Sequence, residues 1–389
     1  MFDIDATRPA SPFYQESHQQ WREQLRKFVD REIMPHINDW EESGELPDSL
    51  WHKAADMGLL QQGYPEAFGG ISEGIDNFHM IVTAQELARC GAGGLYATLL
   101  VHGIALPPVV HYASDATRDA VIPAVLDGRA HISLAITEPG GGSDVANLRT
   151  RAVADGDDWI VSGEKTYITG GMRANWFTTA VRTGEDGLEG ISLLLIPADA
   201  NGVSRTPLDK KQGWWCSDTA TIHFDEVRVP ATNLVGEVNR GFIPIVHNFN
   251  HERLAIAASC IEYARVCLQD AIDWAAERVT FGRPLSKRQV IRHKFAEMLQ
   301  RINASQAYLE LCAWQDMHLQ LKPADVALLK VQATQTMEYC AREAMQVIGG
   351  ASYIRGCRVE RIYREVRVNA IGGGSEEIMR DLAVRQLGI

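Results

Sequence analysis

The sequence lacks the features of secreted, membrane-spanning and nucleic-acid-binding proteins. Its seven cysteines form no C-x-x-C pair, and an odd number of thiols fits a reducing compartment better than a disulfide framework. No apolar run approaches the roughly 18 residues that cross a bilayer, and the start, MFDIDATRPASPF, has no signal-peptide pattern. The net charge of −12, with no cluster of Lys and Arg, argues against a nucleic-acid partner. We therefore expect a cytoplasmic protein without a membrane span.

Common catalytic and metal-binding motifs are missing as well. There is no P-loop, no G-x-S-x-G elbow, no H-E-x-x-H and no dinucleotide-binding glycine fingerprint. His247 and His251 lie four residues apart and precede Glu252. On a helix, however, Glu252 projects about 100° from His251 and about 140° from His247, outside a shared ligand sphere. We predict no metal site.

Hydrophobic periodicity divides the chain into three parts. At 389 residues the chain exceeds one ordinary core, so two or three domains are expected. Apolar residues recur every three or four positions up to residue 130, every second position in short segments from 131 to 238, and again every three or four positions afterwards. We predict an α+β protein with an N-terminal helical domain (1–130), a middle antiparallel β-barrel or sandwich domain (131–238) and a C-terminal four-helix bundle domain (239–389).

One acidic residue interrupts the apolar face of a predicted helix near the start of the third part. With Pro244 in the first turn, the inward-facing stripe comprises Ile245, Phe249, Glu252 and Ile256. A carboxylate that loses water has a raised pKa and becomes a plausible proton acceptor at neutral pH. A buried ion pair with the adjacent Arg253 explains the same position equally well.

Glycine-rich stretches follow the ends of two predicted elements. The run IGGGS at 371–375 can bring bare backbone N–H groups close to a ligand. The segment ITEPGGGSD at 136–144 leaves a predicted strand with backbone donors and hydroxyls suited to a phosphate or a ring edge, although an ordinary turn has the same composition. An inward base at Glu252 and a glycine-lined donor site together suit proton abstraction next to a carbonyl.

Two further patterns each allow two interpretations. Tyr167 and Thr169 alternate along a predicted strand and thus share a face, where they would offer a stacking ring and a hydrogen-bond donor to one flat ligand; a core tyrosine fits as well. The small-residue stretch at 91–94 either deepens a pocket or allows close helix packing.

Taken in order, these segments resemble those of the acyl-CoA dehydrogenases. The resemblance runs from about Tyr14 to the C-terminus and is most similar to the long-chain and isovaleryl-type branch, with EKTYIT and HERL in place. Its motifs are ITEPGGGSDV, WIVSGEKTYITGG, FDEVRVP before the segment 233–237, ERVTFGRPL, QVIGG at 346–350 and IGGGSEEIM.

The resemblance implies an FAD enzyme that oxidises a medium-chain, long-chain or branched acyl-CoA to the trans-2-enoyl-CoA. It also implies a homotetramer and an electron-transfer flavoprotein as the electron acceptor. Expected FAD-binding residues, some acting across a subunit interface, are Ile136, Thr137, Ser143, Tyr167, Thr169, Arg278, Phe281, Gln346, Gly349, Gly350, Ser375 and Glu377. Expected substrate-binding residues are Ser143, Arg253 and Gly373. An acyl-CoA oxidase or other flavoenzyme on this scaffold, or a silent acyl-CoA-binding protein, remains an alternative.

Two departures from the family pattern affect the expected chemistry. Many members have tryptophan where Tyr167 stands, and many carry their catalytic glutamate at the position of Gly373. In the long-chain and isovaleryl-type branch the base instead comes from the helix that carries Glu252, followed by the same arginine. The resemblance thus implies that Glu252 takes the α-proton while the β-hydride passes to flavin N5.

Overall fold

The N-terminal part is helical in the computed structural model, which describes residues 3–247 and 249–389. A π-helical turn at Val29–Ile33 follows the first helix directly and buries Val29 and Ile33. The eight helices are α1 (Glu16–Phe28), α2 (Ile37–Ser43), α3 (Ser49–Asp56), α4 (Asn77–Ala88), α5 (Gly93–Leu99), α6 (His102–Ala105), α7 (Pro107–Tyr112) and α8 (Asp115–Leu126).

The middle part is a seven-stranded mixed sheet, so the predicted antiparallel barrel or sandwich is corrected. Its strands are β1 (Ile132–Ala135), β2 (Arg151–Asp155), β3 (Asp158–Thr169), β4 (Trp176–Arg182), β5 (Ile191–Pro197), β6 (Val203–Pro207) and β7 (Thr219–Pro230). The order is β1-β4-β2-β3-β7-β6, with β5 paired to β4. β1 and β2 both pair with β4 in parallel, and the other pairs are antiparallel. A period of two identifies a strand but not its direction, and for that reason the sequence missed the parallel pairs.

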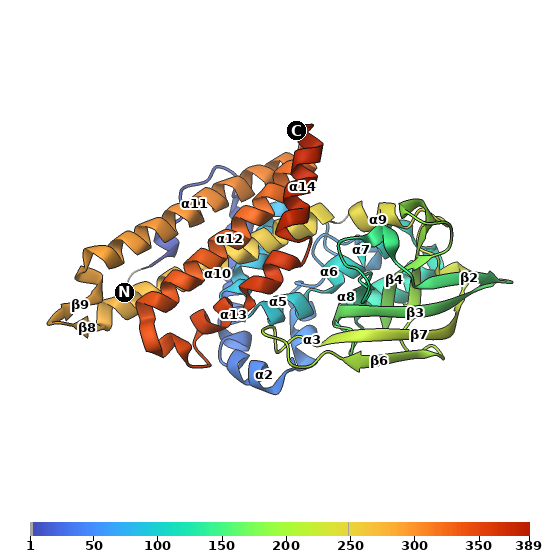
Figure 1. The fold of residues 1–389 in the computed structure, drawn as a ribbon, viewed down its shortest axis with the longest axis horizontal. Helices are drawn as coiled ribbons and strands as arrows, with labels where there is room; N and C mark the ends of the chain where they lie inside the picture. The colour runs from blue at the N-terminus through green and yellow to red at the C-terminus, as the bar shows by residue number, and fades with distance from the viewer. Residues whose placement is uncertain (1–2, 248) are drawn as a thin grey trace.

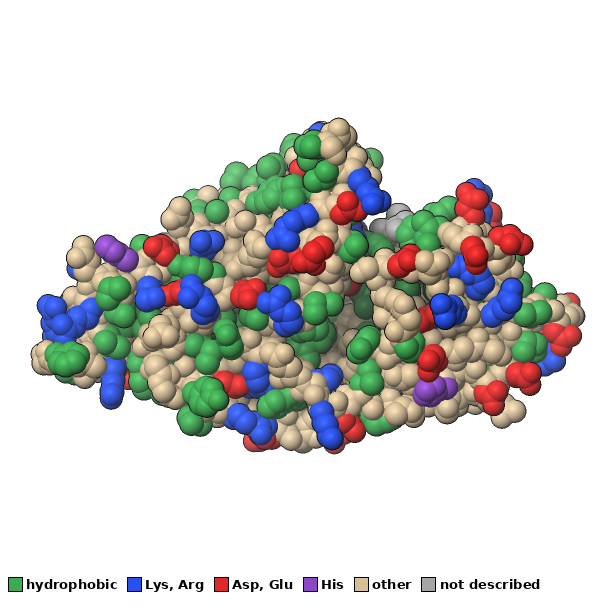
Figure 2. All heavy atoms as spheres, in the orientation of Figure 1, with side chains coloured by type: hydrophobic (Ala, Val, Ile, Leu, Met, Phe, Trp, Pro, Cys, Tyr) green, Lys and Arg blue, Asp and Glu red, His purple; other side chains and the backbone are tan. Residues whose placement is uncertain are grey.

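The C-terminal part is a set of long helices packed side by side (Figure 1). Its elements are α9 (Phe242–His247), α10 (Phe249–Glu277), the hairpin β8 (Val279–Thr280) and β9 (Arg283–Pro284), α11 (Gln289–Met317), α12 (Pro323–Ile348), α13 (Arg358–Ile371) and α14 (Glu376–Leu387). α10 and α12 bury apolar side chains in one core that also takes in Phe78 and Ile81 of α4. Phe249, in the first turn of α10, packs against the apolar cluster that contains Ile191 and Leu193 of β5, so this end of α10 lies beside the sheet. Figure 2 shows the surface hollowed between the helical body and the sheet.

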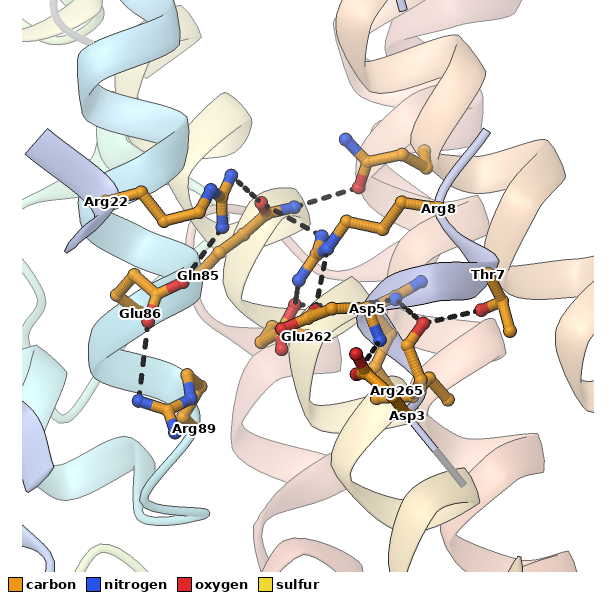
Figure 3. Close-up of polar contacts among 12 residues, drawn as sticks. Asp3, Asp5, Thr7, Arg8, Arg22, Gln85, Glu86, Arg89, Glu262 and Arg265 are labelled. Atoms are coloured by element: carbon orange, nitrogen blue, oxygen red, sulfur yellow. Dashed lines mark hydrogen bonds and ion pairs between the residues drawn. The ribbon is translucent and has the colours of Figure 1, made fainter. Parts of the chain in front are cut away.

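Ion pairs fasten the N-terminal segment across α4 and α10 (Figure 3). Arg8 lies 2.8 Å from Glu262 of α10, and Arg265 donates to the carbonyl of Ile4 at 2.6 Å. On α4, the fully buried Glu86 accepts from Arg22 at 3.0 Å. Arg8 bridges the two helices, because it also donates to Oε1 of Gln85 on α4 at 3.4 Å. Removing one partner of a buried ion pair typically costs about 3–5 kcal/mol, so this network stabilises the packing of α10 against α4.

Among the described residues, no single helix is long and apolar enough to cross a membrane. One bent pair, α5 with the segment His102–Tyr112, passes on length and composition alone, with an angle of 50° between its two parts. Leu95, Leu99 and Val109 of this pair are buried inside the fold, as expected of core helices.

Candidate active site

Glu252 lies in the first turn of α10, on the stripe that the sequence predicts. Ile245 is buried, and Phe249, Glu252 and Ile256 are partly buried. The side chains around the Glu252 carboxyl remove most of its contact with bulk water, and this desolvation raises its pKa against the opposing charges of Arg253 and Lys330. The raised pKa is the electrostatic property that a general base needs near neutral pH.

Arg253 does not form the buried ion pair that the sequence left open. Within the described part of the chain, the Glu252 carboxylate has no hydrogen-bond or ion-pair partner. The Arg253 Nε donates instead to the carbonyl of Gly373 at 3.2 Å, and its guanidinium lies 5.3 Å from the centre of the Phe249 ring. Arg253 therefore connects α10 to the glycine run and leaves the Glu252 carboxylate available.

Gly373 lies directly against Glu252. Its φ of +67°, and the +109° of Gly374, fall in the left-handed region that favours glycine. A Cβ added at Gly373 would lie 3.7 Å from Oε1 of Glu252 and only 2.7 Å from Cδ1 of Ile256. A side chain at position 373 would thus project into the space beside the Glu252 carboxyl.

The same turn offers unpaired backbone donors. The N–H of Gly372 bonds to the carbonyl of Val368 at 2.8 Å, but in the described chain the N–H groups of Gly373 and Gly374 have no acceptor. A partly buried N–H without a partner is costly unless a ligand or water satisfies it. Gly373 therefore combines a free donor with a neighbouring base.

Lys330 of α12 is a site residue that the sequence reasoning missed. It is fully buried, and its Nζ donates to the carbonyls of Ala370 and Gly374 at 2.9 and 2.8 Å. The available signal was a lysine on an apolar face, since Ala327, Lys330, Thr334 and Met337 follow helical spacing and are all buried.

The glycine-rich loop after β1 is anchored from β3. Lys165 is fully buried and donates to Oε1 of Glu138 at 2.7 Å and to the carbonyl of Ile136 at 3.1 Å. The N–H of Thr166 bonds to the carbonyl of Thr137 at 2.8 Å. Burial lowers the pKa of Lys165 to about 8, while Lys165 is the main cause that lowers the pKa of Glu138. Ile136 and Thr137 are therefore rigidly placed, whereas Ser143 is exposed further along the loop.

Tyr167 sits in a β-bulge rather than in a regular strand. The pairing of β3 with β7 shifts between Lys165 and Ile168, and Tyr167 has φ +58° and is 69% exposed. The bulge interrupts the regular alternation that predicted a shared face for Tyr167 and Thr169, because the extra residue turns the ring outward. Positive φ at an aromatic residue is strained, and such strain is concentrated at ligand sites.

The remaining predicted FAD residues form two groups that one chain does not bring together. Ser375 caps α14 through Ile378 N, and Glu377 lies in the first turn of that helix, next to the glycine run. The other group follows the far ends of α10 and α12, at the end marked by β8 and β9 in Figure 1. About 39 Å of α10 separates Glu252 from Arg278. The far group comprises Arg278, Phe281, Gln346, Gly349 and Gly350, all exposed.

The small-residue stretch at 91–94 serves close packing. A Cβ on Gly91 would lie 3.2 Å from Cβ of Arg358 on α13, and one on Gly93 would lie 2.3 Å from Nε1 of Trp214. A Cβ on Gly94 would lie 3.0 Å from the Cα of Trp214. These glycines let α5 approach α13 and the loop before β7, so they do not deepen a pocket.

One cluster among the described residues brings histidine and carboxylate atoms close together. Within residues 3–247 and 249–389, only His18, Asp76 and His79 offer ligand atoms that all lie within 4.8 Å of one another. Asp76 is the N-cap of α4 and accepts from the N–H groups of Phe78 and His79, which explains the cluster as a helix cap. His251 pairs with Asp316 at 2.9 Å, and the side chain of His247 lies outside the described residues.

Family models match nearly the whole chain. Those of the N-terminal, middle and C-terminal domains of acyl-CoA dehydrogenases match residues 15–129, 133–227 and 239–388. The chain belongs to the acyl-CoA dehydrogenase family. It is an oxidoreductase of the kind that acts on the CH–CH bond of an acyl-CoA, and the family's members are flavoproteins.

Individual relatives extend over almost the same length. Acyl-CoA dehydrogenase AFT10-1 of Alternaria alternata is 40% identical and covers 98% of this chain and 93% of its own. The long-chain specific mitochondrial enzyme of Sus scrofa is 31% identical, over 96% of this chain and 87% of its own. A probable acyl-CoA dehydrogenase from Mycobacterium abscessus superimposes with a TM-score of 0.94 at 42% identity, covering 97% of this chain and 100% of its own.

Proposed function

We propose that this acyl-CoA dehydrogenase uses FAD to oxidise a medium-chain, long-chain or branched acyl-CoA to the trans-2-enoyl-CoA, with Glu252 as the catalytic base. The observation that carries the proposal is the contact between Glu252 and Gly373. The desolvated carboxyl lies 3.7 Å from the position of a Cβ on Gly373, in the space where many family members carry their glutamate. A glutamate at position 252 and a glutamate at position 373 would therefore place their carboxylates in the same part of the site.

The residues around Glu252 suit removal of the α-proton of a thioester. This proton is weakly acidic, so the base must be kept from bulk water, and the negative charge that develops on the thioester oxygen must meet donors already in position. Glu252 takes the proton, and the unpaired N–H of Gly373 is the donor for that oxygen. FAD, which Ile136, Thr137 and Tyr167 would help to hold, would supply the acceptor for the β-hydride at its N5 and would pass the electrons to an electron-transfer flavoprotein-type partner.

Exposed aromatic residues fit the flavin. Tyr167 holds a strained, outward ring at the bulge of β3, next to the anchored loop of Ile136 and Thr137. Phe281, 98% exposed in the turn between β8 and β9, also has positive φ. Since the two groups stand about 39 Å apart along α10 of one chain, the adenosine diphosphate half is held by the far group of a second copy.

The purified protein is expected to be yellow, with about one FAD per chain, and to be a tetramer. The residue groups at both ends of α10 require a neighbouring copy to complete each site. Absorbance spectra, released-flavin content and light scattering measure the three quantities. A colourless protein that takes up no FAD contradicts the proposed function. Rapid reoxidation of the reduced flavin in air would instead indicate an oxidase, and no bleaching by any acyl-CoA would indicate a silent binding protein.

Phe281→Ala is expected to lower FAD retention, although Phe281 is remote from Glu252 of its own chain. Loss of an aromatic stacking contact typically costs about 0.5–1.5 kcal/mol beyond the lost area, or a factor of about 2 to 13 in affinity. Leu319→Ala is the matched control, because Leu319 is 96% exposed and also has positive φ but lies outside the predicted FAD residues. The ratio of flavin to protein after gel filtration distinguishes them. Equal FAD retention in both variants would remove Phe281 from the site.

A further inference from the structure

Lys330 of α12 contacts the backbone on both sides of the glycine turn. Its Nζ donates to the carbonyl of Ala370, in the last turn of α13, and to that of Gly374, on the other side of Gly373. The last four carbonyls of a helix have no partner inside the helix, and a cation at that end also interacts favourably with the helix dipole. The Lys330 ammonium group thus provides a hydrogen-bond donor both to a carbonyl at the end of α13 and to a carbonyl of the turn.

The turn would be poorly determined without this connection. Gly373 and Gly374 both have positive φ, and glycine samples more backbone conformations than any other residue. Arg253 holds the turn as well, since its Nε donates to the carbonyl of Gly373 at 3.2 Å. Two cations thus fix three carbonyls, while within the described chain the N–H groups of Gly373 and Gly374 stay unpaired.

Lys330 also lies among the charged groups of the site. It faces Glu252, Arg253 and Cys260 of α10 and Glu376 of α14. Glu252 in turn faces Arg253 of its own helix, Lys330 and, from α5, Tyr96. Burial lowers the pKa of Lys330 to about 8, so the ammonium is charged at pH 7 and favours the ionised form of Glu252.

We propose that Lys330 is a positioning residue for the dehydrogenation: its ammonium group, bound to the carbonyls of Ala370 and Gly374, holds the glycine turn so that Gly373 presents a free N–H beside Glu252. This inference rests on the proposed function, since it assigns Lys330 a role in the same site. Lys330 acts through the turn and through its charge, without touching the substrate.

Lys330→Met removes the charge and both hydrogen bonds while keeping an unbranched chain of similar length. We expect the rate of flavin reduction by a good acyl-CoA to fall about 10- to 100-fold, because a displacement of 1 Å in a reacting group can cost 10²-fold. KM should change less than threefold, since Lys330 itself does not touch the substrate in the proposed role. The acid limb of the pH profile should move to higher pH, because loss of a positive charge raises the pKa of Glu252.

Hydrogen exchange provides a readout that does not depend on activity. The peptide covering residues 368–380 should exchange faster in Lys330→Met than in the parent holoenzyme, because the turn has lost two of its fixed carbonyls. If Lys330→Met does not fold, Lys330→Gln, which keeps a donor for one carbonyl, takes its place with the same expected directions.

Lys294→Met is the matched control. Lys294 of α11 pairs with the buried Glu343 of α12, so this variant loses an ion pair in the same bundle without touching the glycine turn. It should keep the parental turnover, pH profile and exchange of peptide 368–380. A Lys330→Met holoenzyme with turnover within threefold of the parent, an unmoved acid limb and unchanged exchange would overturn the proposal.

The parent holoenzyme separates failure of this inference from failure of the proposed function. If no acyl-CoA bleaches the parent flavin, the proposed function fails. The exchange of peptide 368–380 then decides whether Lys330 holds the turn at all. If the parent is active and Lys330→Met behaves as Lys294→Met does, the proposed function stands and the role of Lys330 falls.

Discussion

Glu252→Gln is expected to keep its flavin, bind acyl-CoA and lose about 10² to 10⁴ of its turnover, the usual effect of removing a positioned base. Glutamine preserves the shape of the side chain in the space beside Gly373 but cannot accept the α-proton. Within the described chain the Glu252 carboxylate has no hydrogen-bond partner, so the substitution leaves no buried donor without an acceptor. Stopped-flow measurement of flavin bleaching by acyl-CoA determines the loss directly.

Glu262→Gln on the same helix is the control for this variant. Glu262 is buried, and it pairs with Arg8 at 2.8 Å in the network that holds the N-terminal segment. It should lose thermal stability rather than turnover. Near-parental bleaching in Glu252→Gln would mean that the base lies elsewhere, and the described residues offer no second carboxyl against Gly373.

The pH dependence of the parent enzyme provides a second check on Glu252. The base must be ionised to accept a proton, and burial raises its pKa above the ordinary value of 4.5. Activity is therefore present above the raised pKa and is lost as the pH falls through it, at a higher pH than for an exposed glutamate. The acid limb of flavin reduction should disappear from the accessible range in Glu252→Gln.

The order of helical, strand and helical parts was predictable because periodicity reports which faces are buried. Strand direction was not, since β1 and β4 are short and buried at almost every position, and such a run looks the same in a parallel sheet as in the core of an antiparallel sandwich. The bulge at Tyr167 was equally hidden, because a bulge inserts a residue without changing the residue types around it.

Within the site, a carboxylate on an apolar stripe was enough to find Glu252, and three glycines in succession were enough to find the turn. The contact between them depends on how α10 packs against the end of α13, and a single sequence does not determine that packing. Lys330 was not predicted as a site residue, because the apolar residues at helical spacing around it are typical of a core-facing helix. Its hydrogen bonds to the carbonyls of Ala370 and Gly374 reveal the connection to the turn. Gly91, Gly93 and Gly94 had two interpretations until their neighbours on α13 and at Trp214 were visible.

Acyl-CoAs longer than butyryl-CoA are expected to be the better substrates, because Gly373 adds no side chain of its own beside the reacting carbons. A Cβ at position 373 would meet Cδ1 of Ile256 at 2.7 Å, so a long chain or a methyl group at C3 would contact this flexible apolar side chain rather than a second carboxylate. Each buried methylene contributes up to about 0.8 kcal/mol, or roughly a fourfold gain. Four further methylenes in an apolar pocket would then raise kcat/KM by roughly 200-fold until the pocket is full.

The measurement is kcat/KM for butyryl-, octanoyl-, palmitoyl- and 3-methylbutyryl-CoA with an artificial electron acceptor. The expectation about chain length depends on Gly373 alone, because the glycines at 91–94 pack closely against neighbouring residues. Straight and branched chains therefore both belong in the panel, and either optimum agrees with the absence of a side chain at position 373. A clear preference for butyryl-CoA would contradict the expectation, because it would mean that other side chains close the pocket just beyond C4 and that the space at Gly373 admits only the base.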